Sequence, residues 1–139
     1  MSDLVVDTDV VSYGYRSSPE FAFYEPHLKG NRAIVSFMTY AELLYGAALR
    51  GWGERRWEEL RRYLLSNHTI FDTPMSLCVI WSSLMCQARK QGRVLHHADA
   101  WVAATAVYLN VPLLSNNRRD FEYLEGLQLI SNTPSSPSE

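Results

Sequence analysis

Cysteine and histidine are both scarce in this sequence. There are two cysteines, Cys78 and Cys86, and four histidines in 139 residues, and the two cysteines do not have the CxxC spacing. A disulfide scaffold or a cysteine-bound zinc site needs more cysteines at characteristic spacings. The scarcity therefore argues against both and is typical of a protein from a reducing compartment.

Long apolar runs are absent as well. The N-terminus has no basic region followed by an apolar stretch, so it does not predict a secretory signal. The most apolar stretch, residues 100–114, is interrupted by a threonine, an asparagine and a proline and is too short to span a bilayer. We therefore expect a cytoplasmic protein without a membrane partner.

The sequence also lacks a strong net charge. Thirteen Lys and Arg against fifteen Asp and Glu give a net charge of −2, which argues against a protein that binds polyanions through bulk positive charge. A local basic patch is still compatible with this balance. At 139 residues the chain has the size of one domain, which we expect over residues 1–130. The tail, residues 131–139, is rich in serine and proline and is predicted to be disordered.

Short apolar runs alternate with helix-type periodicity along the chain. The runs predict strands over residues 4–6, 33–35, 69–71, 111–114 and 127–130. Helices are predicted over residues 39–50, 54–65 and 98–109, and from Pro74 to the residue before Gly92, with Thr73 as N-cap. Glu58 and Arg62 are expected to pair along the second of these helices. The alternation predicts an α/β fold with helices on both faces of a parallel sheet of four to five strands.

Four acidic residues stand where the predicted strands end or the predicted helices begin. Asp7 follows the first strand, and Glu42 lies in the first turn of the helix after the second. Asp99 opens the helix that leads into the fourth strand, and Asp120 comes six residues after that strand. These positions share one edge of a right-handed βαβ sheet. We therefore expect the carboxylates to meet in one cleft, although each Asp taken singly is also compatible with a plain helix cap.

Such a cluster of carboxylates needs a counter-charge. Two unit charges about 4 Å apart repel by roughly 4 kcal/mol at an effective dielectric constant of 20. A helix N-terminus offsets only about 0.3–1 kcal/mol of this. Protons or a divalent cation must therefore neutralise the cluster. Oxygen ligands with few histidines nearby favour Mg²⁺ or Mn²⁺ over zinc.

The four acids lie in four distinctive segments. These are LVVDTDVVS from Leu4, VSFMTYAELLYG from Val35, DAWVAATA from Asp99 and LSNNRRDF from Leu114. Together the segments resemble the sequence blocks of PIN-domain ribonucleases of the VapC toxin type. They occur in that family's order and at its spacing, and they cover nearly the whole chain to Ile130.

The resemblance implies a PIN fold and an Mg²⁺- or Mn²⁺-dependent endoribonuclease that cleaves single-stranded RNA. It assigns metal and catalytic roles to all four acids. Asp7 and Asp99 would hold the metal, and Glu42 would orient or deprotonate the attacking water. Asp120 would complete the metal shell or hold a second ion, unless Asn117 serves there as a ligand-positioning group instead. In-line attack on the scissile phosphate would then leave a 5′-phosphate and a 3′-hydroxyl. The implied partners are RNA, a cognate antitoxin protein and a second copy of the chain in a homodimer.

Polar and basic neighbours extend the predicted site. Hydrogen bonds that hold the carboxylates in place could come from the side chains of Thr8, Thr39, Ser115 and Asn117. Cap and turn roles for these four are an equally good interpretation. Arg118 and Arg119 stand beside the predicted cleft, and we expect them to contact RNA. Arg50 and the arginines of residues 55–62 stand close to Trp57 and Tyr63 and could follow RNA phosphates in the same way, but for residues 55–62 we favour the solvated face of a helix.

Two alternative functions remain open at this point. The segment Asp7-Thr8-Asp9 resembles the first motif of haloacid dehalogenase-type phosphatases, in which the first acid is the nucleophile and the second is the general acid. The later Gly-Asp pair of those enzymes is missing, and Glu42 would have no role. The PIN family more often has Asn at the position of Asp9. The other alternative is a degenerate PIN domain that only binds RNA or protein.

Overall fold

A computed structural model of the chain describes residues 2–135. The elements follow in the order β1 (Asp3–Val6), α1 (Thr8–Arg16), α2 (Phe21–Leu28), β2 (Arg32–Val35), α3 (Phe37–Leu49), α4 (Glu54–Asn67), β3 (Thr69–Ile70), α5 (Leu77–Lys90), α6 (His97–Leu109), β4 (Leu113–Leu114), α7 (Arg118–Phe121) and β5 (Leu129–Ile130). Within residues 2–135, no helix is both long and apolar enough to cross a membrane.

The strands form one parallel sheet with the order β3-β2-β1-β4-β5. Leu4 pairs with Ala33 on one side of β1, and Val5 pairs with Leu113 on the other. Because β1 is central, its carboxyl end lies between the carboxyl ends of β2 and β4. The predicted α/β class and the predicted parallel sheet are confirmed.

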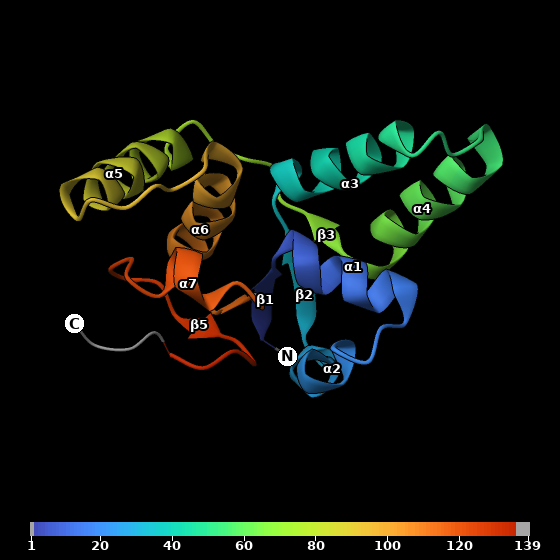
Figure 1. Ribbon diagram of the computed structural model, residues 1–139, viewed down its shortest axis with the longest axis horizontal. Coiled ribbons are helices and arrows are strands. Elements are labelled where there is room, and N and C mark those ends of the chain that lie inside the picture. Colours follow the sequence, from blue (N-terminus) through green and yellow to red (C-terminus); the bar gives the residue numbers. More distant parts are fainter. Residues whose placement is uncertain (1, 136–139) are drawn as a thin grey trace.

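Helices cover both faces of this sheet (Figure 1). Val5 and Ile34 point to one face and pack with apolar residues of α5 and α6, such as Leu84 and Ala103. Leu4, Val6 and Val35 point to the other face and pack with α1, α3 and α4. The alternation of side chains along β1 thus divides the apolar core into two layers, one on each side of the sheet.

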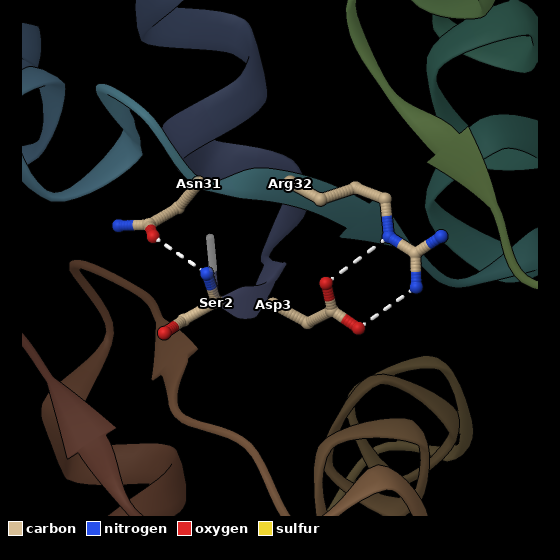
Figure 2. Close-up of polar contacts among 4 residues, drawn as sticks. All are labelled: Ser2, Asp3, Asn31 and Arg32. Atoms are coloured by element: carbon tan, nitrogen blue, oxygen red, sulfur yellow. Dashed lines mark hydrogen bonds and ion pairs between the residues drawn. The ribbon is translucent and has the colours of Figure 1, made fainter.

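Polar contacts fasten the amino-terminal edge of the sheet (Figure 2). The Arg32 guanidinium donates two hydrogen bonds to the Asp3 carboxylate, at 2.8 and 3.1 Å. The Ser2 amide donates to Asn31 Oδ1 at 3.0 Å. Asp3 begins β1 and Asp7 follows its last residue, so these two carboxylates lie at opposite ends of the central strand.

Most predicted helices are confirmed, with small shifts at their ends. Asn110 closes α6 in the left-handed conformation at φ 56°, which suits asparagine. The predicted start of the helix at Pro74 is wrong. Residues 74–76 form a turn, the helix begins at Leu77, and Thr73 does not cap it. The predicted Glu58–Arg62 pair is also wrong, because Glu58 pairs with Arg61 instead, at 2.8 Å.

Three helices were not expected from the sequence, namely α1, α2 and α7. Helix α1 begins directly after β1, where Asp7 acts as N-cap and accepts a hydrogen bond from the Thr8 amide. It has only two fully buried residues, Val10 and Val11, which is too few for a clear helical period. Helix α2 contains Pro26, and α7 has four residues. These features explain why pattern reasoning did not find them.

The segment after β5 is held against the domain at its start. The Arg118 guanidinium donates to the carbonyl oxygens of Ser131 and Thr133, at 3.2 and 2.6 Å. The buried Tyr24 hydroxyl accepts from the Asn132 amide at 3.0 Å and donates to Asn116 Oδ1 at 2.7 Å. Disorder was expected from residue 131 onward, but the structure gives residues 131–133 defined hydrogen bonds. Residues 136–139 lie outside the described residues.

Substitution Tyr24→Phe is expected to lower the free energy of unfolding by about 1–3 kcal/mol. The phenyl ring keeps the apolar packing, but the Asn132 amide and the Asn116 side chain both lose a buried partner. Denaturant unfolding of the variant beside the wild type measures the change. Equal stability of the two proteins would show that these bonds do not hold the segment after β5.

Candidate active site

The most buried carboxylate of the site is that of Asp7, which is 5% exposed. Asp7 Oδ1 accepts a hydrogen bond from the Thr8 amide at 2.8 Å, and Oδ2 accepts from the Ser115 hydroxyl at 2.7 Å. Burial and the nearby charges of Asp9 and Asp99 raise the pKa of Asp7 to about 8, against the lowering effect of the two hydrogen bonds. At neutral pH this carboxyl is therefore protonated unless a cation is bound beside it.

Asp9 joins helix α1 to the loop after β4. Its Oδ1 accepts from the Val10 amide at 2.7 Å, and its Oδ2 accepts from the Asn116 amide at 3.0 Å. Burial raises the pKa of Asp9 above its usual range. Both oxygens of this carboxylate thus accept from main-chain amides, which assigns Asp9 a structural contribution next to Asp7.

Glu42 contacts Thr8, the first residue of α1. The Thr8 hydroxyl donates to Glu42 Oε1 at 2.9 Å and lies 3.0 Å from the Thr39 hydroxyl. A hydroxyl has one proton, so Thr39 donates to Thr8 whenever Thr8 donates to Glu42. Because α3 begins at Phe37, with Ser36 as its N-cap, Glu42 lies in the second turn and not in the expected first turn.

Asp99 lies half-buried in the first turn of α6. Burial, together with the charges of Asp120 and Glu42, raises the pKa of Asp99 to about 6. Among residues 2–135 its carboxylate has no hydrogen-bond donor, in contrast to Asp7. A half-buried carboxylate without a donor is costly unless a cation or solvent satisfies it.

Asp120 lies at the margin of this group. Its Oδ2 accepts from the Asn117 amide group at 2.5 Å, and its charge is the largest electrostatic contribution to the raised pKa of Asp99. Asn117 also donates its main-chain amide to the Ser115 hydroxyl at 3.0 Å. Ser115 and Asn117 thus connect Asp120 to Asp7 through the loop after β4.

Most of these side chains line one cavity of about 460 Å³, which we call the acidic cavity. Its carboxylates are those of Asp7, Asp9, Glu42 and Asp99, and Thr8 and Asn117 also line it. Asp120 does not line it. The expected convergence of acids from distant parts of the chain therefore holds for Asp7, Glu42 and Asp99, with Asp120 close by.

The donor set of the acidic cavity suits a hard divalent cation. Within the described residues, no three Asp, Glu, His or Cys side chains are placed to hold an ion by themselves. Mg²⁺ usually keeps several waters and takes only one or two carboxylates from the protein. Asp7 and Asp99 fit that requirement, because both are desolvated carboxylates facing further negative charge. A bound cation would lower the pKa values of both.

The two arginines predicted to contact RNA have different surroundings. Arg118 is half-buried, and its guanidinium donates to main-chain carbonyls of the segment after β5. Arg119 is exposed. Two polar residues that line the acidic cavity were not placed there from the sequence: Arg50, which was considered only as one of several arginines that could follow RNA phosphates, and Ser12, which had no predicted role. Arg50 is the residue four positions after Gly46, the glycine of the second sequence block, and this spacing on one helix face was the available signal.

Most of the chain matches one known protein family. Residues 4–127 match the family model of the PIN domain. The chain belongs to the PIN-domain family. One relative is Ribonuclease VapC1 of Haemophilus influenzae strain R2866, which is 27% identical over 129 residues that span 89% of this chain and 93% of the relative.

Two solved structures share the PIN fold of this chain. The first is VapBC-1 from nontypeable Haemophilus influenzae, with a TM-score of 0.80 and 24% identity, covering 93% of this chain and 97% of the other. The second is VapBC-5 from Mycobacterium tuberculosis, described as a member of the VapBC family of toxin–antitoxin systems. Its TM-score is 0.67 at 20% identity, covering 93% of this chain and 98% of the other. At these identities the likeness supports the fold.

Proposed function

We propose that this PIN domain is a divalent-metal-dependent endoribonuclease that cleaves single-stranded RNA in the cytoplasm, as the toxin of a toxin–antitoxin pair. The observation that carries the proposal is the meeting of Asp7, Glu42 and Asp99 in the acidic cavity of a PIN-family chain. The relative named as a ribonuclease and the neighbours solved as VapBC assemblies support the same function.

The proposed mechanism assigns a separate task to each carboxylate. Asp7 and Asp99 would hold Mg²⁺ or Mn²⁺, which supplies a Lewis acid and lowers the pKa of a bound water. Glu42 is exposed at the cavity and accepts the Thr8 hydroxyl on Oε1, which leaves its other oxygen free to orient water or accept a proton. Asp120 keeps Asn117 in place and adds negative charge beside Asp99. The products expected from in-line attack of water carry a 5′-phosphate and a 3′-hydroxyl.

The proposed protein partners are a cognate antitoxin and a second copy of the chain. An apolar surface supports self-association, because Met75, in the turn before α5, is 85% exposed and Val79, in the first turn of α5, is 72% exposed. A neighbouring cavity is lined by Phe37, Phe71 and Trp101. Exposed apolar side chains gathered in this way are typical of protein interfaces.

The direct test is incubation of the purified protein with single-stranded RNAs in Mg²⁺ or Mn²⁺ and, in parallel, in EDTA. We expect cleavage only with the metal, and products whose 5′ ends are substrates for a 5′-phosphate-dependent exonuclease. A panel of RNAs that stays intact under every metal condition would favour a degenerate PIN domain that only binds its partners.

Asp9→Asn separates the nuclease from the haloacid dehalogenase-type alternative. A phosphatase of that type would lose its general acid and with it essentially all activity. In the nuclease, the asparagine keeps a carbonyl oxygen for one main-chain amide, so cleavage of RNA should stay within about tenfold of the wild-type rate. Loss of activity toward RNA that matches the loss in Asp7→Asn would contradict the structural role assigned to Asp9.

A further inference from the structure

A second cavity of about 460 Å³ adjoins the acidic cavity, and we call it the arginine-rich cavity. The two share three lining residues, Ser12, Leu43 and Arg50, so they form one continuous depression in the surface. The chemistry described so far uses only the acidic half. An enzyme that cleaves a polymer must also hold the units on either side of the bond it breaks.

The interior of the arginine-rich cavity is apolar and aromatic. Val11, Leu60 and Leu64 are buried and form its apolar part. Tyr15 and Trp52 are half-buried there, with ring centroids 6.4 Å apart and ring planes 34° apart. A lining of this kind accepts a flat apolar group, and aromatic side chains are the usual stacking surface for unpaired bases.

Three exposed guanidinium groups, those of Arg16, Arg50 and Arg56, line the same cavity. Among the described residues none of the three forms an ion pair with a carboxylate. On the same helix as Arg56, by contrast, Arg55 pairs with Glu59 and Arg61 pairs with Glu58. The Arg56 guanidinium lies over the Trp52 ring, 3.8 Å from its centroid. The arginine-rich cavity therefore offers positive charge to an anion directly above an aromatic surface.

Arg50 lies at the boundary between the two cavities. Its guanidinium folds back along α3, so that Nη1 lies 3.5 Å from the position a Cβ would take at Gly46. Gly46 itself lines the acidic cavity. A phosphodiester chain that passes from the acidic cavity into the arginine-rich cavity would bring its next phosphate to this cation.

We infer that the arginine-rich cavity binds the RNA nucleotide next to the scissile phosphate, with its base in the aromatic lining of Tyr15 and Trp52 and its phosphate beside Arg50 and Arg56. This inference rests on the proposed nuclease function and adds a subsite to it. Charge complementarity and continuity with the acidic cavity favour RNA over a protein ligand. A peptide would need acidic side chains for the arginines and a cationic side chain for the carboxylates, whereas one RNA strand with a bound divalent ion suits both cavities.

The test compares Trp52→Leu and Arg56→Gln with the control Arg55→Gln, which removes the same charge one position away, outside the cavity. For a short single-stranded RNA, Trp52→Leu should raise KM about 5- to 100-fold, because the base loses the larger ring of its aromatic lining. Arg56→Gln should raise KM and also lower the slope of log Kd against log salt concentration by about 0.7, the value for one phosphate contact. Arg55→Gln should match the wild type.

A change in the RNA supplies a second readout on the unaltered protein. An abasic residue next to the cleaved bond should raise the wild-type KM by a factor similar to that of Trp52→Leu. The same abasic RNA should cause no further rise in that variant. The rise in the wild-type KM with the abasic RNA can be measured even where Trp52→Leu folds poorly, and an unchanged wild-type KM would refute the base-binding part of the subsite.

Failure of the inference can be distinguished from failure of the proposed function. If the wild type cleaves RNA but both variants share the KM and salt slope of Arg55→Gln, the subsite is refuted. The subsite is also refuted if the variants lose only the binding of a protein partner. If the wild type cleaves no RNA, the nuclease proposal fails, and equal Kd values of all four proteins for a fluorescent RNA then overturn the subsite too.

Discussion

Asp7→Asn is expected to lower the rate of RNA cleavage at saturating Mg²⁺ by at least roughly 100-fold, since the metal contributes several kcal/mol to the transition state. Asparagine has the shape of aspartate but lacks its charge, so the site loses a ligand that can neutralise a cation. The fold should survive, because the Thr8 amide still has an oxygen acceptor and the Ser115 hydroxyl can rotate to accept from the new amide group. Asp99→Asn should have an effect of the same order.

The matched control is Asp3→Asn, at the start of the strand that Asp7 follows. Asp3 lies at the opposite end of this strand from Asp7 and pairs with Arg32 (Figure 2). This variant also removes one carboxylate charge, but away from the acidic cavity, and should keep wild-type cleavage. Rates are compared at several Mg²⁺ concentrations, so that a loss of affinity is separated from a loss of turnover. Unchanged cleavage by Asp7→Asn or Asp99→Asn in excess metal would refute the assignment of the site.

The second prediction concerns stability in the absence of divalent ions. The pKa of Asp7 is about 8 in the folded protein, against 3.8 for an ordinary aspartate. Between these two pH values the folded state binds a proton that the unfolded state has released. The free energy of unfolding should therefore fall as the pH rises from 4 to 8, by up to about 1.4 kcal/mol per pH unit for one proton. Asp99, with a pKa of about 6, should add to the fall below pH 6.

Mg²⁺ should counteract the fall in the free energy of unfolding toward high pH. The ion binds the charged carboxylates of the folded state, so its stabilising effect should be larger at pH 8 than at pH 5. In EDTA at pH 8, Asp7→Asn should be more stable than the wild type by a few kcal/mol in order of magnitude, and its pH profile should be flatter. Asp3→Asn should keep the wild-type profile, because Arg32 lowers the pKa of Asp3 and places its titration below this range.

Thermal unfolding in EDTA and in Mg²⁺ at a series of pH values measures both effects. A wild-type protein whose Tm rises from pH 5 to pH 8 in EDTA would contradict the raised pKa of Asp7. A Tm that does not respond to Mg²⁺ at pH 8 would contradict the binding of the ion at this site. The stability of Asp7→Asn then decides whether Asp7 or another carboxyl is responsible.

Local patterns in the sequence were sufficient for the α/β class and for three of the acids. Each apolar run fixes a strand through its own side chains, and parallel strands with helical crossovers place their carboxyl ends at one edge. Asp7, Glu42 and Asp99 therefore meet in one cavity, as expected. Local patterns did not predict the start of α5 at Leu77 or the pairing of Glu58 with Arg61. Alternative turns and ion pairs one residue apart differ by very little free energy.

The fold class and the residue types that gather at the edge of the sheet follow from short-range periodicity, so the order of residues is enough to predict them. How those residues are used depends on contacts between distant segments of the folded domain. Thr8 is attached to Glu42 across 34 residues, and Asp9 is attached to Asn116 across 107. Arg118 turns toward the segment after β5, and Arg56 lies unpaired over Trp52. These contacts arise when whole layers pack together, and no pattern within one segment records that packing.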